Sequence, residues 1–203
     1  MSDKFSGPLI KLQTREYGMT LIEIMAVIAI ISILSAVAVP VIISILPDYR
    51  LRAAISDLYS NLQRAKQEAV RSNGECGVYL DVANNRYQVI AGGPDGVCDG
   101  PAAGFPPLPL NDDILINYMD LSDYGSGVRY GSGTAKKTVP GGNIPPIVTV
   151  SYVNDRIRFD AKGMARELGY IYLTNVNSSA YAVGTPSISG SIVQKRWLET
   201  LWE

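Results

Sequence analysis

The sequence predicts an α+β protein in which one long amino-terminal α-helix packs on a mainly antiparallel β-sheet head. A run of 23 residues, from Ile24 to Leu46, contains no charged residue. Beyond it, apolar residues recur at spacings of three and four as far as Ala69, which is the pattern of an amphipathic helix. The rest of the chain is a series of short segments rich in β-branched and aromatic residues, which is typical of strands.

Composition excludes several functional classes. The chain has 203 residues, 18 basic and 19 acidic, and no histidine, with a formal net charge of -1. Its length suits one domain with an appendage. The absence of histidine removes Ser-His-Asp triads and histidine-based zinc sites, and the near-zero charge argues against a strongly basic DNA-binding surface. We therefore expect a protein that is not an enzyme and holds no cofactor or metal.

The run 24–46 has the length of a membrane helix. At 1.5 Å per residue it extends roughly 34 Å, enough for the hydrocarbon core of a bilayer. A buried core helix and a cleaved secretory signal peptide are the alternatives. The first is disfavoured by the length of the run, and the second because the apolar stretch continues well beyond the small residues 35–38.

The residues around the start of this run carry a specific motif. Gly18 ends a polar leader and is followed by Met19, Thr20, Leu21, Ile22 and Glu23, before about twenty apolar residues. This pattern resembles the amino-terminal signal of type IV pilins and of the pseudopilins of type II secretion. The resemblance implies that a prepilin peptidase cuts between Gly18 and Met19 and that the new amino group of Met19 is methylated. Family members usually have phenylalanine where this chain has Met19.

Glu23 is the one charge at the start of the apolar helix. A carboxylate in lipid is costly, and an ionisable residue inside a membrane is a functional candidate by default. The resemblance implies that Glu23 pairs with the amino terminus of a neighbouring subunit during filament assembly. The alternative is an interfacial glutamate without a role. Pro40 removes one helical hydrogen bond, so we expect a kink or a locally melted stretch there.

The segments then follow in order. Residues 1–18 are the leader, 19–46 the transmembrane and filament-core helix, 47–74 its amphipathic continuation, and 75–203 the head, an arrangement like the lollipop of pilins. The apolar positions of the second helical half are Leu51, Ile55, Leu58, Leu62, Ala65 and Ala69, and Asn73-Gly74 ends the helix.

We expect the head to begin with a hairpin of 76–82 and 86–91, turned at Asn84-Asn85. The further strand candidates are 114–119, 147–153, 157–160, 169–174, 180–183 and 188–193. The segment from Arg156 to Ala165 contains Phe159-Asp160 and Gly163, and with the final strands it resembles the GspH/FimT subgroup of minor pilins and pseudopilins. The arginine that usually follows the last turn glycine of that subgroup is missing after Gly190.

Some FimT-like pilins bind DNA through basic residues near the carboxyl terminus. Here Lys195 and Arg196 are the candidates for contacts with phosphates, together with Arg166 and the pair Lys136-Lys137. Short clusters of this kind are usually solvated surface, so nucleic-acid binding is the less favoured interpretation.

Cys76 and Cys98 are the two cysteines of the chain. An even pair in a head exported from the cytoplasm favours a disulfide, which would close a loop of about twenty residues and stabilise the head by roughly 3 kcal/mol. Two free thiols are the alternative.

Three further segments invite interpretation. Asp95, Asp99, Asp112 and Asp113 surround a glycine-rich loop that could hold calcium, although a polar turn is favoured. Residues 122–146 predict a long surface loop. The final residues 197–203 hold both tryptophans and have the spacing of a helical turn, which either packs on the head or docks a partner.

Together these features predict a structural minor pilin or pseudopilin. We expect it in the inner membrane, with a single pass and the head in the periplasm, and later in a type II secretion pseudopilus or a type IV pilus, near the tip. Its expected partners are other pilin subunits, the prepilin peptidase and the assembly platform of the inner membrane. The alternative function is an adhesive or DNA-binding minor pilin of a competence pilus.

Overall fold

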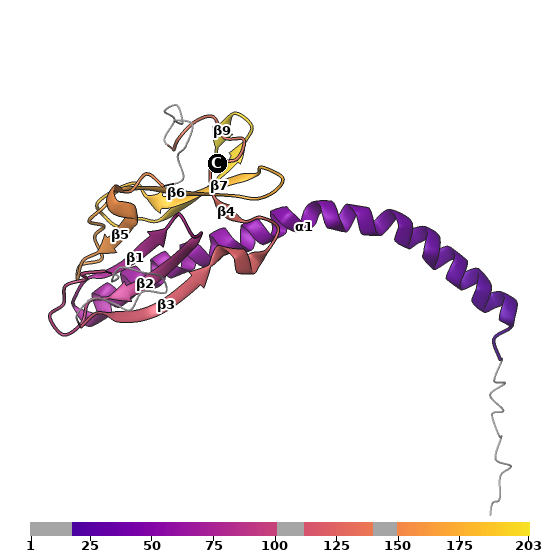
Figure 1. Cartoon of the computed structure of the whole chain (residues 1–203), viewed down its shortest axis with the longest axis horizontal. Helices are drawn as coiled ribbons and strands as arrows, with labels where there is room; N and C mark the ends of the chain where they lie inside the picture. Colours follow the sequence, from indigo (N-terminus) through magenta and orange to yellow (C-terminus); the bar gives the residue numbers. More distant parts are fainter. Residues whose placement is uncertain (1–17, 101–111, 140–149) are drawn as a thin grey trace, which may run out of the picture. The chain divides into compact units, whose positions relative to one another are not determined.

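A computed structural model describes residues 18–100, 112–139 and 150–203 of the chain. It divides into two compact units, one ending at Ile42 and the other comprising Ile43–Glu203 (Figure 1). Residues 147–149 of the predicted strand 147–153 lie outside the described residues, as does part of the predicted loop 122–146. The described residues 150–153 do not form a strand: Val150 makes an isolated bridge with Ile171, and Val153 begins a 3-10 helix.

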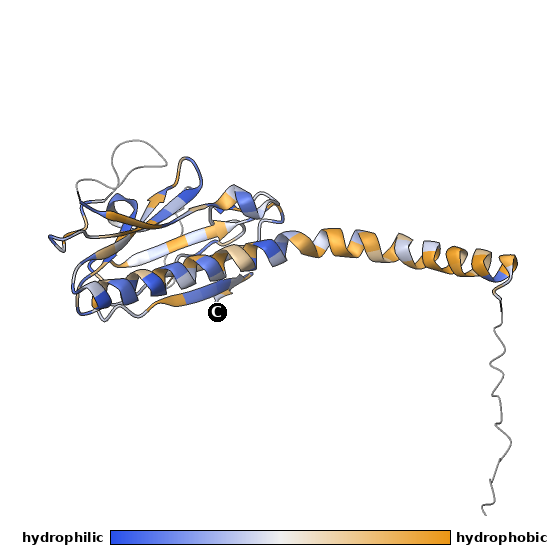
Figure 2. Ribbon diagram, turned by 90° about the horizontal axis from the view of Figure 1, so that it is seen from below, coloured by the Kyte–Doolittle hydropathy of each residue, from blue (hydrophilic) through white to orange (hydrophobic). Residues whose placement is uncertain are grey.

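The helix α1, Leu21–Ser72, runs without interruption through Pro40 and Pro47. The locally melted stretch expected at Pro40 is therefore absent, and the kink stays a prediction. Figure 2 shows the change of character along α1, from mainly hydrophobic in its first half to mixed in its second half. It ends as predicted: Asn73 has a φ of 53°, and the Gly74 N–H donates to the Ala69 carbonyl.

Two antiparallel sheets make up the head (Figure 1). The four-stranded sheet has the order β3-β2-β1-β5, and the five-stranded sheet the order β4-β6-β7-β8-β9. The strands are β1 Cys76–Asp81, β2 Arg86–Ala91, β3 Ile114–Asp120, β4 Arg129–Tyr130, β5 Arg156–Phe159, β6 Gly169–Thr174, β7 Ala180–Thr185, β8 Val193–Leu198 and β9 Leu201–Trp202. Two short 3-10 helices lie between them, Leu121–Tyr124 and Val153–Asp155.

The core lies between one face of α1 and one face of each sheet. All six predicted apolar positions of the amphipathic helix are fully buried there. They contact alternate residues of β1, β2, β5, β6 and β7, among them Tyr87, Phe159 and Ile171. The helical period of 3.6 and the strand period of 2 thus place the apolar faces against one another, and this burial stabilises the head.

The structure differs from the sequence prediction at two places near the carboxyl terminus. The predicted strand 188–193 is a turn region instead, and the last strands begin at Val193. The predicted helical turn at 197–203 is part of the β8–β9 hairpin, in which Trp197 pairs with Trp202 and Glu199 has a φ of 54°. The two tryptophan rings lie 5.3 Å apart, and this cross-strand contact favours the hairpin.

In the described part of the segment 122–146, the structure is more ordered than predicted. It contains the end of the 3-10 helix Leu121–Tyr124 and the strand β4. Val128 and Tyr130 are buried in the core, so the stretch contributes to packing.

Candidate functional site: the capped apolar helix and its hold on the head

The start of α1 is organised by Thr20. The Glu23 backbone N–H lies 3.3 Å from the Thr20 hydroxyl oxygen and 3.1 Å from the Thr20 carbonyl, and the Ile24 N–H also donates to that carbonyl. A threonine three residues before a glutamate is the pattern of an N-terminal capping box. The threonine of the motif therefore has a local structural reason, because it satisfies backbone donors that a helix start leaves unpaired.

Glu23 projects from the first turn of this helix. It is exposed, and it forms no ion pair with any residue that the structure describes. A negative charge near a helix amino terminus is favoured by the helix dipole. The carboxylate is thus available to a cation from outside the described chain, while Gly18 and Met19 lie just before the helix, also exposed.

The part of α1 that follows is apolar and exposed. Its large hydrophobic side chains from Leu21 to Leu46 are between 37% and 80% exposed. By length and composition, α1 can cross a membrane, and it is the one helix in the described residues that can. The Ser32 hydroxyl donates to the Ile28 carbonyl at 2.8 Å, so this polar group needs no water.

The head holds α1 directly after the apolar run. The Asp48 Oδ1 atom accepts hydrogen bonds from Asn175 Nδ2 at 2.7 Å and from the Ser179 hydroxyl at 2.8 Å, and Asn177 donates to the Ser44 carbonyl at 3.2 Å. Burial alone raises the pKa of Asp48, but the hydrogen bonds from Asn175, Ser179 and Asn177, together with the charge of Arg196, outweigh it and leave the pKa below its ordinary value. We call these contacts the Asp48 clasp. Sequence reasoning missed it, because its donors lie in the β6–β7 turn, far along the chain.

The segment from Arg156 to Ala165, which resembles the GspH/FimT subgroup, makes a second set of contacts with α1. Asp160 Oδ1 accepts the backbone N–H groups of Lys162 and Met164, both at 2.9 Å, which closes the turn. Gly163 has a φ of 74°, and a Cβ there would lie 3.1 Å from the Lys66 side chain, so glycine allows the turn to approach α1. The Lys66 ammonium in turn donates to the Gly190 carbonyl at 2.9 Å. The motif is therefore structural.

Beside this turn, a chain of ion pairs links the connection between α1 and β1 to β5 and to the segment that follows β5. Glu75 lies 3.4 Å from the Arg158 Nη1 atom and 2.7 Å from the Arg166 Nη2 atom. Arg158 also contacts Glu167 at 2.8 Å. The predicted phosphate-binding role of Arg166 is thus weakened, because its guanidinium already has a carboxylate partner.

The other basic candidates do not form one surface. Lys195 and Arg196 are neighbours in β8, so they project to opposite faces of the sheet. The Arg196 guanidinium lies over the Tyr181 ring at 5.9 Å. Lys195 lines a pocket with Lys137, while Lys136 is not among its lining residues. The structure therefore separates the residues that the DNA-binding interpretation would need together.

The structure does not contain the expected disulfide. Cys76 and Cys98 are both buried free thiols. Cys76 packs in the core against α1, whereas Cys98 packs with Tyr79 and Ile90 on the other face of the sheet. Strand alternation separates the two sulfur atoms, since Cys76 and Tyr79 project to opposite sides of β1. Burial raises the pKa of Cys76 far above its usual range and that of Cys98 to about 11, so both thiols stay protonated at neutral pH.

The aspartates around the glycine-rich loop accept backbone hydrogen bonds. Asp95 accepts from Val97 at 2.9 Å, Asp112 from Asp95 at 3.3 Å, and Asp113 from Gly100 at 2.9 Å. Among the residues described, no group of three or more His, Cys, Asp or Glu side chains is placed to hold a metal ion. These bonds are those of a polar turn.

Comparison with known proteins fits this geometry. Residues 13–39 match the family model described as the prokaryotic N-terminal methylation motif. This confirms the resemblance of the amino-terminal segment to type IV pilins. The matched segment lies on the apolar part of α1, and this helix continues into the antiparallel β head.

Among solved structures, the chain is similar to the minor pseudopilin EpsH from the type 2 secretion system of Vibrio cholerae. The two share 13% sequence identity with a TM-score of 0.44, over 72% of this chain and 97% of that chain. Comparison with curated protein sequences gives no significant match.

Proposed function

We propose that this chain is a structural subunit of a pilin-type filament, a minor pilin or pseudopilin, and not an enzyme. In this proposal a prepilin peptidase cuts between Gly18 and Met19, and the new amino group of Met19 is methylated. Before assembly, the subunit lies in the inner membrane with its head in the periplasm. It then joins other pilin subunits, through the assembly platform, near the tip of a type II secretion pseudopilus or a type IV pilus.

One observation carries the proposal. Glu23 is an exposed carboxylate without a partner among the described residues, on the first turn of a bare apolar helix that matches the methylation motif. In a low-dielectric filament core, an unpaired carboxylate is expensive to bury, and so is an unpaired amino terminus. Pairing the two between neighbouring subunits offsets part of both costs. The motif thus provides the anchor and the assembly contact in the same segment.

The test separates membrane insertion from assembly. We expect Glu23→Leu to insert in the membrane and to be processed like the wild type, but to be depleted from sheared filaments, because its neighbour's amino terminus loses the partner. Glu68→Leu, in the amphipathic half, is the matched control. Amino-terminal mass spectrometry of membrane and filament fractions measures both steps. Normal recovery of Glu23→Leu in filaments would contradict the proposal, as would an intact leader in cells that contain the peptidase.

The second candidate function, a DNA-binding or adhesive pilin, receives less support. Arg166 is paired with Glu75, and Lys195 and Arg196 project to opposite faces of the sheet.

A further inference from the structure

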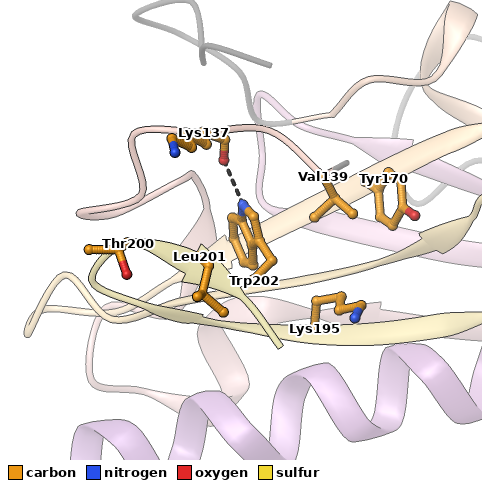
Figure 3. A pocket seen from close by; sticks show the side chains of 7 residues that line it. All are labelled: Lys137, Val139, Tyr170, Lys195, Thr200, Leu201 and Trp202. Atoms are coloured by element: carbon orange, nitrogen blue, oxygen red, sulfur yellow. Dashed lines mark hydrogen bonds between the residues drawn. The ribbon is translucent and has the colours of Figure 1, made fainter. Parts of the chain in front are cut away.

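A pocket on the head is lined by residues from three separate segments. It has a volume of about 470 Å³, in the size range of small-ligand sites, and lies beside the β8–β9 hairpin (Figure 3). The lining residues are Lys137, Val139, Tyr170, Lys195, Thr200, Leu201 and Trp202.

The walls of the pocket are largely apolar and are held in place. Trp202 occupies the middle of the view in Figure 3, with Val139 and Tyr170 to one side and Leu201 to the other. Its indole N–H donates to the Lys137 carbonyl at 2.6 Å, and its ring lies 5.5 Å from the Tyr172 ring. A planar group entering the pocket would therefore meet an indole that is already oriented, which reduces the entropic cost of binding.

The charge of the pocket is positive and uncompensated. Lys137 comes from the segment after β4, and Lys195 from β8. Among the described residues, no carboxylate belongs to the lining and neither lysine forms an ion pair. Figure 3 shows the two ammonium groups on opposite sides of Trp202, with that of Lys195 on the side of Val139 and Tyr170. A cation beside an apolar wall favours an anion with an apolar body.

We propose that this pocket binds an apolar, aromatic group that carries a carboxylate. A sugar fits less well, because the described part of the lining has no Asp, Asn or Gln to pair with its hydroxyls. A nucleic-acid strand needs a row of cations along its backbone, and Arg196 lies on the opposite face of β8. Within a filament, the ligand is a carboxyl terminus or an acidic side chain next to an aromatic residue of a neighbouring subunit; this assignment alone rests on the proposed function.

The binding test uses the full chain in a neutral detergent and the probe N-acetyl-L-phenylalanine. Both tryptophans of the chain belong to the β8–β9 hairpin, so their fluorescence reports on this region. For a ligand of this size we expect a dissociation constant on the order of a millimolar. N-acetyl-L-phenylalaninamide, which lacks the charge, should bind about tenfold more weakly, as the loss of a charged hydrogen bond predicts.

Variants locate the site. Lys195→Gln should weaken binding of the acid about tenfold. Lys137→Gln keeps the backbone carbonyl that Trp202 uses and should weaken binding less, because the Lys137 ammonium lies on the other side of Trp202 (Figure 3). Lys136→Gln removes an adjacent exposed charge outside the lining and should leave the affinity unchanged. Thermal unfolding of each variant checks that the head is intact.

The outcomes are decisive in either direction. Saturable binding of the acid that is weakened by Lys195→Gln supports the pocket, whatever the fate of the filament proposal. A second probe, N-acetyl-Phe-Glu-amide, distinguishes the sources, since tighter binding of this peptide favours an acidic side chain over a chain end. Four results would each overturn the proposal. The chain could bind the acid and the amide with equal affinity, or inorganic phosphate could change the fluorescence as much as the acid does. Lys136→Gln could weaken binding of the acid as much as Lys195→Gln does, or neither fluorescence nor ligand-observed NMR could detect binding.

Discussion

Removal of the carboxylate at the centre of the Asp48 clasp is expected to destabilise the head. In Asp48→Ala, the Asn175 amide loses its acceptor while fully buried, which costs about 1–3 kcal/mol. The Ser179 hydroxyl loses a second bond, worth about 1 kcal/mol, and the higher helix propensity of alanine returns about 0.6 kcal/mol. The net loss in the free energy of unfolding is about 2 kcal/mol at pH 7.

Urea unfolding of the full chain in detergent, followed by tryptophan fluorescence, measures this loss, with Asp123→Ala as an exposed control. The pH dependence gives a second criterion. Because the folded pKa of Asp48 lies below its ordinary value, the clasp contributes fully above about pH 4 and is lost as the pH falls through the lowered pKa. The difference between wild type and Asp48→Ala should therefore narrow in acid. Equal stability of the two alanine variants at pH 7 would refute the reasoning.

Two further predictions concern the core and the thiols. Leu58→Ala, at a fully buried position of α1, should lower the free energy of unfolding by about 2–5 kcal/mol. Val70→Ala, at a position that is 51% exposed, should change it by less than about 0.5 kcal/mol. Similar losses in the two variants would contradict the packing of α1 on the sheets. Alkylation followed by mass spectrometry without reduction should modify Cys76 and Cys98 slowly in the folded chain and both of them in urea, since they are buried protonated thiols; a species that resists alkylation in urea would show the disulfide instead.

Much of the fold could be predicted from the local periodicity of apolar residues. The apolar spacing from Leu51 to Ala69 reports a helix face directly, and all of its predicted positions are buried. The first hairpin was also predictable, because Asn85 supplies the positive φ, 55°, that the turn requires.

The sequence-based prediction failed at 197–203, because this short segment is compatible with both the helical and the strand period. Trp197 and Leu201 have helical spacing, yet Trp197 and Trp202 are also placed to pair across a two-residue turn. Contacts with Tyr172 and the Lys137 carbonyl, both distant in sequence, accompany the strand form. The disulfide prediction failed for a similar reason, since spacing says nothing about which face of the sheet the loop residue Cys98 reaches.

The distribution of contacts along α1 implies that the head folds without the apolar segment. The first buried residue of the helix is Pro47, and the Ser44 carbonyl accepts a hydrogen bond from the Asn177 side chain of the head. A chain that starts at Ser44 keeps the Asp48 clasp and every buried position of α1. We therefore expect it to be soluble and to unfold cooperatively, with a free energy of unfolding within about 1 kcal/mol of the full chain, since frayed helix ends contribute little. A molten or aggregated fragment would mean that the apolar half of α1 helps to fold the head, and its exposure would then need another explanation.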